Sequence, residues 1–221
     1  MESQRVYCAG PLFNQSERDE MKSIAEELVA ADHSVYLPHR DGMEFRLVRE
    51  VLIERGWDAE IAGQFLHEAI FAMDIYQLAI GCDAMVWNMN GRVPDEGAVS
   101  EAAIAWTLGK PLVAYQDDIR SMVAGRMNPL LAGLVEFTKV DRIEEIPAAL
   151  FVECQRTKSR PVDVDRVPAK LKIAIQRGDE LWMTLSTERA FGENNIIADC
   201  VTNLFAPSSH HKPRLTGAKS G

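Results

Sequence analysis

Short apolar runs along the chain alternate with longer stretches in which apolar residues recur every three or four positions. The runs at residues 6–9, 34–37, 84–87 and 112–115 have the length and composition of buried strands, and a fifth strand is expected over 135–140. Strands separated by helical stretches predict right-handed crossovers and a parallel sheet. The expected fold class is therefore α/β, with a Rossmann-like or flavodoxin-like sheet of about five strands and helices on both faces.

The stretches between the first four runs predict helices, and three more helices follow the last run. They are expected from the N-cap Asn14 to about Asp32, over 46–80 with a break near Gly56, over 97–108 and 143–157, and over 171–185 and 197–205. We therefore expect an α/β domain over 1–157, a helical extension over 158–205 and a disordered tail over 206–221.

Charge and hydropathy narrow the possible partners. The 221 residues include 24 Lys and Arg against 33 Asp and Glu, a formal net charge of −9, and 47% of the residues are hydrophobic. A negative field repels polyanions, so neither nucleic acid nor an anionic membrane is expected as a partner. The first residues are polar and no apolar run reaches membrane-spanning length, so a cytoplasmic protein is expected.

The sequence has no pattern for a metal or for a nucleotide cofactor. Cys8, Cys82, Cys154 and Cys200 are widely spaced, with no Cys-x-x-Cys pair, and are expected to be buried free thiols. Neither a G-x-G-x-x-G nor a P-loop pattern is present. We expect no metal and no cofactor.

Acidic residues gather where the third predicted strand gives way to a helix. The loops after parallel strands meet at one edge of the sheet, where ligands bind, and Asp95 and Glu101 flank this junction. With no His nearby and no Ser in a nucleophile elbow, carboxylate chemistry of the kind used in glycosyl transfer is favoured. Glu101 is the better nucleophile candidate, because the start of an Ala-rich helix leaves space and favours the ionised form.

Each of these residues also has a purely structural explanation. Asp95 can cap the helix that follows it, Glu101 can be a solvated helix residue, and Asp74 can be a surface acid on an amphipathic helix. Tyr7 and Phe13 can be ordinary core aromatics. From the residues alone, both interpretations stay open.

An ordered set of short motifs extends over roughly residues 4–140. It consists of Tyr7-Cys8-Ala9-Gly10-Pro11-Leu12-Phe13, Asp74 ahead of Cys82-Asp83-Ala84-Met85-Val86, Asp95-Glu96-Gly97-Ala98-Val99-Ser100-Glu101, and Gly109-Lys110-Pro111. Taken together, this set closely resembles the nucleoside 2-deoxyribosyltransferase family. There are two departures: Ala98 stands where the family often has Thr, and Ala103 where a Gly commonly follows the nucleophile.

The resemblance implies a role for each matching residue. Glu101 would attack C1′ of a 2′-deoxyribonucleoside and form a deoxyribosyl ester, from which a second base takes the sugar. Asp74 would protonate the departing base, and Asp95 would bind a sugar hydroxyl. Tyr7 would orient the nucleophile. The small-molecule partners would be nucleosides and nucleobases.

The resemblance also implies how the rest of the site is built. Phe13 would form a wall against the base, and Gly10 permits close backbone approach. Met127 and Asn128 match a Met and an Asn that reach in from an adjacent subunit in the family, although Asn before Pro is also a common turn. A homo-oligomer follows from that match.

Two other functions remain open. A related branch with this fold hydrolyses deoxynucleoside 5′-monophosphates; Asp95 would repel such a phosphate unless Arg40 or Arg92 paired with it. Transfer and hydrolysis share their first half-reaction, and the sequence does not choose between them. The second alternative is a non-catalytic nucleotide-binding module, which the presence of both Glu101 and Asp74 disfavours.

Overall fold

A computed structural model describes residues 2–91, 93–118, 127–157, 161–188 and 193–207. These residues form two compact units, and each unit combines two separate parts of the chain. The sheet unit comprises the chain up to Asp41 together with Gln77–Arg166, and the helical unit comprises Gly42–Tyr76 together with the chain from Val167 onward. Within the described ranges, no helix is both long enough and apolar enough to cross a membrane.

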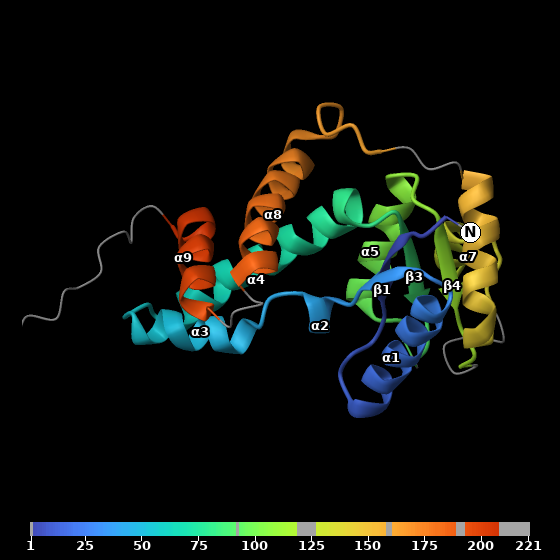
Figure 1. Cartoon of the computed structure of the whole chain (residues 1–221), viewed down its shortest axis with the longest axis horizontal. Coiled ribbons are helices and arrows are strands. Elements are labelled where there is room, and N and C mark those ends of the chain that lie inside the picture. Colours follow the sequence, from blue (N-terminus) through green and yellow to red (C-terminus); the bar gives the residue numbers. More distant parts are fainter. Residues whose placement is uncertain (1, 92, 119–126, 158–160, 189–192, 208–221) are drawn as a thin grey trace, which may run out of the picture. The chain divides into compact units, whose positions relative to one another are not determined.

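The sheet unit is built on a parallel sheet with the strand order β2-β1-β3-β4 (Figure 1). Its strands are β1 (Arg5–Ala9), β2 (Ser34–Tyr36), β3 (Ala84–Asn88) and β4 (Leu112–Tyr115). Every residue of β3 and β4 is buried, as continuous apolar runs in a sheet covered on both faces should be. The α/β fold class and four of the predicted strands are confirmed.

The fifth predicted strand, over 135–140, is wrong. Val140 forms only an isolated parallel bridge with Tyr115, so the sheet has four strands within the described residues. Just before it, helix α6 (Pro129–Leu134) ends in a turn in which Phe137 N–H donates to Ala132 O at 2.7 Å. Glu136 and Phe137 have φ values of 50° and 64°, which a strand does not allow. The apolar spacing therefore belongs to the end of a helix and not to a strand.

Helices cover both faces of the sheet. Helices α1 (Gln15–Ala30) and α7 (Ile146–Thr157) pack on one face, and α5 (Glu96–Thr107) packs on the other (Figure 1). Most of the first face is apolar, with Val6, Cys8, Val86 and Val113 against residues of α1 and α7, and the buried Asn88 at the end of β3 donates to Glu20 of α1. The short helix α2 (Pro38–Asp41), the π-helical turn η1 (Gln77–Gly81) and the 3-10 turn η3 (Ile143–Glu145) complete the described elements of this unit.

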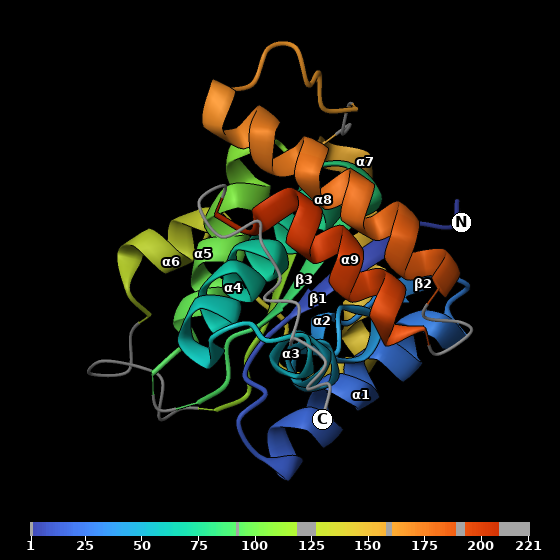
Figure 2. The same cartoon turned by 90° about the vertical axis from the view of Figure 1, so that its left-hand side faces the viewer.

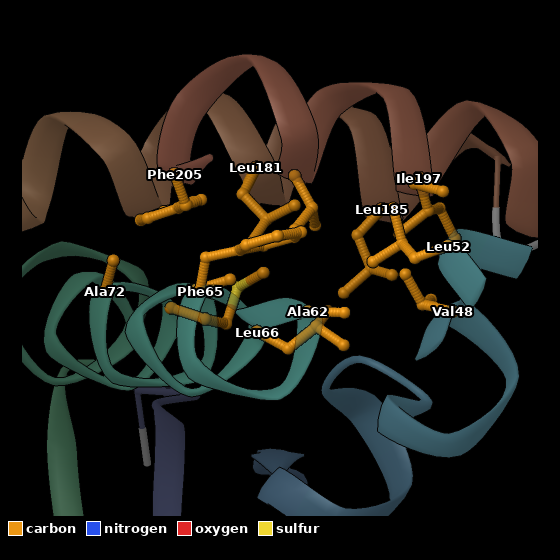
Figure 3. Packing of buried hydrophobic residues seen from close by; sticks show 14 residues of the cluster. Val48, Leu52, Ala62, Phe65, Leu66, Ala72, Leu181, Leu185, Ile197 and Phe205 are labelled. Atoms are coloured by element: carbon orange, nitrogen blue, oxygen red, sulfur yellow. The ribbon is translucent and has the colours of Figure 1, made fainter. Parts of the chain in front are cut away.

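The helical unit contains α3 (Phe45–Glu54), α4 (Ala59–Tyr76), α8 (Ala169–Glu188) and α9 (Asn194–Phe205) (Figure 2). The predicted break near Gly56 and the two C-terminal helices are confirmed. The helices meet around one apolar cluster, shown in Figure 3, whose members include Leu52, Leu66, Leu181 and Val201. The segment Gly42–Tyr76 thus packs with the C-terminal helices. The expected domain boundary at 157–158 stays a prediction, and the expected tail over 206–221 lies mostly outside the described residues.

Candidate active site

Glu101 lies in the second turn of α5 and forms a hydrogen bond with a strand of the sheet. The hydroxyl of Tyr7, in the middle of β1, donates to Glu101 Oε1 at 2.6 Å. Tyr7 alternates with Val6 and Cys8, so its side chain points to the sheet face that α5 covers. On α5 the buried residues are Ala98, Ala102 and Ala105, whose small side chains let the helix approach the sheet closely. The structure thus brings the two predicted residues together.

The pKa of the Glu101 carboxyl group is raised to near neutral pH. The pKa of Glu101 is raised from its ordinary value of 4.5 to about 7: burial has the largest effect and raises it, the hydrogen bond from Tyr7 lowers it, and the charge of Asp95 raises it. The sequence predicted that the helix N-terminus would favour the ionised form. The effect of the helix N-terminus fades after the first turn, and Glu101 lies in the second turn. Desolvation therefore has the larger effect on the pKa of Glu101.

Tyr7 is fixed by a neighbour that the sequence did not point to. Tyr36 of β2 is in register with Tyr7, and the two ring centroids lie 5.4 Å apart. Both residues are fully buried. The cross-strand pair packs the Tyr7 ring, and this holds its hydroxyl toward Glu101. Only the strand register, which a single sequence does not give, could have identified Tyr36.

Asp95 caps α5, as its structural explanation proposed. Its Oδ1 accepts a hydrogen bond from Ala98 N–H at 2.7 Å. Asp95 is half-buried, and its Oδ2 accepts no hydrogen bond from the described part of the chain. Capping and binding are therefore compatible, because a ligand hydroxyl can still donate to the second oxygen.

The loop after β1 approaches the sheet closely at Gly10 and then starts α1. A Cβ on Gly10 would lie 2.6 Å from Met21 Sδ and 2.7 Å from Asn88 Cβ, so only glycine fits there. Asn14 caps α1, and Glu17 completes a capping box by accepting from the backbone N–H groups of Asn14 and Phe13. The Phe13 side chain is 77% exposed, so it is free to contact a ligand.

A network of amides and acids lies at the carboxyl ends of β3 and β4. Asn88 Nδ2 and Asn90 Nδ2 donate to the two oxygens of Glu20, at 2.7 and 2.8 Å, and Asn90 also donates to Asp117 at 2.7 Å. A cavity of about 370 Å³ opens beside this network, lined by Pro11, Glu17 and Asp118 among others. The sequence carried a usable signal for this network, because Asn88 and Asn90 follow closely on the predicted strand at 84–87.

Three other predicted residues belong to α4 or lie at the start of α6. Asp74 is half-buried near the end of α4 and belongs to the helical unit. Asn128 is exposed and caps α6 by accepting from Leu130 N–H at 2.9 Å, and Met127 beside it is half-buried. Within the sheet unit, the described interactions link Tyr7, Asp95 and Glu101.

The thiols and the candidate metal ligands suggest no further chemistry. All four cysteines are free; Cys8 and Cys82 are buried and the other two are half-buried. Burial raises the pKa of the Cys82 thiol to about 12, which makes it a poor nucleophile. Among the described residues, no three His, Cys, Asp or Glu side chains are grouped so as to hold a metal ion.

One comparison with known proteins, a family model, agrees with the motif set. The family model described as nucleoside 2-deoxyribosyltransferase matches residues 6–176. A comparison with curated proteins finds no match. One solved structure, described as a conserved protein from Enterococcus faecalis V583, has 19% sequence identity and a TM-score of 0.45, over 70% of this chain and 99% of that chain. Because this family model matches most of the chain, the chain belongs to the nucleoside 2-deoxyribosyltransferase family.

Proposed function

We propose that the protein transfers 2-deoxyribose between nucleobases through a deoxyribosyl ester of Glu101. The hydrogen bond from Tyr7 to Glu101 is the observation that supports this proposal best. It fixes one carboxylate oxygen, which leaves Oε2 for attack on C1′ of the nucleoside. The C1′–N bond breaks as the C1′–O bond forms, and the electron pair leaves with the base.

The base needs a proton as it leaves, and Asp74 is the proposed donor. The same carboxylate then takes a proton from the incoming base, whose nitrogen attacks C1′ and releases Glu101. Asp95 Oδ2 accepts a hydrogen bond from a sugar hydroxyl, and the exposed Phe13 packs against the base. Both half-reactions use the same groups, so the cycle needs no metal or redox step.

Free deoxynucleosides are the proposed substrates, in preference to their 5′-monophosphates. In α/β folds a phosphate typically binds the free N–H groups at a helix N-terminus. Here Glu17 N–H on α1 already donates to Asn14 and Ala98 N–H on α5 to Asp95, and the carboxylates of Glu17 and Asp95 at these two helix starts repel a phosphate.

The arginine that could have reversed this preference is already engaged. Arg40 forms a bidentate pair with Asp41, with N···O distances of 2.8 and 2.7 Å. Binding a phosphate would require breaking that pair. Arg92, the other candidate, lies outside the described residues.

A homo-oligomer completes the proposed site, with Asn128 reaching the site of a neighbouring subunit. Its side-chain oxygen caps α6, and its exposed NH₂ group can donate to a ligand. Co-expression of Glu101→Gln with Asn128→Ala tests this arrangement, because mixed oligomers then contain some intact sites. Activity well above that of either variant alone supports the shared site, whereas activity no higher than theirs contradicts it.

The proposed reaction is tested by chromatography of the purified protein with 2′-deoxyinosine, with and without adenine or cytosine. A new deoxynucleoside, absent with Glu101→Gln, is expected. Free deoxyribose without a new nucleoside would assign hydrolysis instead, and no reaction would contradict both. Parallel incubations with 2′-deoxyinosine 5′-monophosphate and with inosine test the preference for an unphosphorylated deoxyribose, and neither is expected to react at a comparable rate.

A further inference from the structure

A cavity of about 590 Å³ lies along the outer edge of β4, within the sheet unit. It is lined by the strand residues 112–114, by the turn that ends at Val140, and by helix α7, which packs beside β4 (Figure 1). On α7 the lining residues recur every three or four positions, and so lie on one side of the helix: Ala148, Ala149, Val152, Glu153 and Arg156. The volume is in the range of small-molecule sites, roughly 300–1,000 Å³.

The edge of β4 that faces this cavity has backbone groups without a partner. Along a parallel strand, the N–H and C=O groups of every second residue point to the same edge. Val140 N–H donates to Ala114 O at 3.0 Å, so the backbone groups of Ala114 and Leu112 point outward. Within the described part of the chain, Leu112 N–H, Leu112 C=O and Ala114 N–H have no hydrogen-bond partner. Leu112 is 6% exposed and Ala114 1%, and buried backbone groups are almost always paired, so these groups require a partner from outside the chain.

The open part of this edge is too short for a β-strand. At one end is Pro111, which has no N–H group and whose carbonyl already accepts from Met85 N–H at 2.9 Å. At the other end Val140 takes up Ala114 C=O and Gln116 N–H. The open groups therefore extend over about 7 Å at about 3.3 Å per residue, whereas strands usually have about five or six residues. A small molecule fits this length better than a strand of a peptide or of a second copy.

The charges around the cavity favour a neutral molecule. The cationic side chains of the described lining are Arg156 and Lys139. Arg156 forms ion pairs with Glu136 and Glu153. Lys139 Nζ donates to Gln116 O at 2.7 Å. Binding of a phosphate or a carboxylate would require breaking these contacts, whereas a neutral ring would leave them in place.

We propose that this cavity is a second, non-catalytic binding site for a nucleobase. A base such as adenine is planar and carries an amino donor next to a ring-nitrogen acceptor. It can therefore donate to Leu112 C=O and accept from Ala114 N–H at the same time, with Ala149 and Val152 as the apolar contact for the ring. The inference goes beyond the proposed function and does not depend on it, because no residue of the described lining takes part in the proposed transfer.

Amide NMR tests this site at one of its own donors. The full-length protein, labelled with ¹⁵N-alanine, is titrated with 9-methyladenine, whose methyl group blocks the nitrogen that would accept a sugar. The signal of Ala114 is identified by its loss in Ala114→Gly. The matched ligand is 6-dimethylamino-9-methylpurine, which has no amino N–H to donate. The matched variants are Val152→Trp, which fills part of the cavity, and Gln155→Trp, which adds the same side chain at an exposed position of α7 outside the lining.

In the parent protein, 9-methyladenine should shift the Ala114 amide signal saturably and to lower field, because a new hydrogen bond forms there. The dimethylamino ligand should bind at least about 10-fold more weakly, because it leaves the Leu112 carbonyl unpaired. Val152→Trp should weaken binding of 9-methyladenine by at least about 10-fold, and Gln155→Trp should leave it within about twofold of the parent.

Several outcomes would overturn the inference. One is an Ala114 signal that does not respond to 9-methyladenine, or that responds equally to the dimethylamino ligand. Another is an unchanged affinity in Val152→Trp, which would mean that the base binds elsewhere. A shift of the same signal with protein concentration alone would assign the edge to a second copy instead. If Val152→Trp does not fold, the comparison of the two ligands on the parent protein decides the question.

Discussion

The two units differ in what they bury. In the sheet unit, polar groups lie within or beside the core: Glu101 bonds to the buried Tyr7, and Asn88 is fully buried against Glu20. Among the described residues, every buried polar or charged residue belongs to the sheet unit, and the buried side chains of the helical unit are apolar. Burial of an ionisable group costs stability but shifts its pKa, whereas apolar burial stabilises the fold. Substitutions at the buried polar groups of the sheet unit should therefore change chemistry most, and those in the apolar cluster of the helical unit should change stability most.

The largest expected effect is at Glu101. Glu101→Ala and Glu101→Gln should each lower kcat for base exchange by a factor on the order of 10⁴ or more, as expected when a nucleophile is removed. Steady-state kinetics measure this, and circular dichroism should show an unchanged fold. Exchange at near-parent rate by either variant would rule out Glu101 as the nucleophile.

The next effect tests the helical unit. Leu52 on α3 is fully buried in the apolar cluster, and its neighbour Ile53 is 38% exposed. Leu52→Ala should lower the free energy of unfolding by about 2–5 kcal/mol, because it leaves a cavity. Ile53→Ala should change it by less than about 0.5 kcal/mol. Chemical denaturation gives both values, and activity per folded molecule should be unchanged. A large loss of activity in folded Leu52→Ala would contradict the view that the apolar cluster of the helical unit serves stability and not chemistry.

A smaller effect concerns pH. The attacking form of Glu101 is ionised and its pKa is about 7, so kcat/KM should rise with pH below 7 and level off above it. Tyr7→Phe removes the hydrogen bond that lowers this pKa, so the midpoint should move to higher pH. At pH 6 the variant should be about 10-fold slower than the parent, which corresponds to one pKa unit. A midpoint that stays or moves to lower pH would contradict the role given to Tyr7.

The smallest expected effect is a gain in stability. Glu101 has its ordinary pKa of 4.5 in the unfolded chain and a pKa of about 7 in the folded chain. Between pH 4.5 and pH 7 the folded state therefore binds the proton more tightly than the unfolded state does. The contribution of Glu101 to the free energy of unfolding therefore falls as the pH rises from 4.5 to 7. Glu101→Gln keeps the shape without the charge and should be more stable than the parent by about 1 kcal/mol at pH 8, with less difference at pH 5. Equal unfolding midpoints at both pH values would mean that the ionised group costs no stability.

The sequence predicted the fold better than it predicted the environment of the site. Four strands were predictable because each is a continuous apolar run, such as Leu112–Tyr115. The segment 135–140 has similar composition, but Glu136 and Phe137 adopt left-handed backbone conformations that composition does not reveal. The motif resemblance singled out Tyr7, Asp95 and Glu101, and the structure of the sheet unit brings them together.

What the sequence missed depends on tertiary structure. The raised pKa of Glu101 follows from burial, and a single sequence does not show which helix face is desolvated. Tyr36 is significant only through its register with Tyr7. The open edge of β4 is apparent only once Val140 is seen to pair with Tyr115 alone. In each case the deciding neighbour is distant in the chain.

The most direct test of the central claim is detection of the ester on Glu101. The protein is mixed, without an acceptor base, with the 2′-fluoro-arabinosyl analogue of 2′-deoxyinosine, whose fluorine opposes positive charge at C1′ and slows breakdown of the ester. Acid quenching followed by peptide mass spectrometry should show one sugar attached at Glu101, and none with Glu101→Gln. Attachment to another residue, or base exchange with no adduct on the chain, would contradict the account.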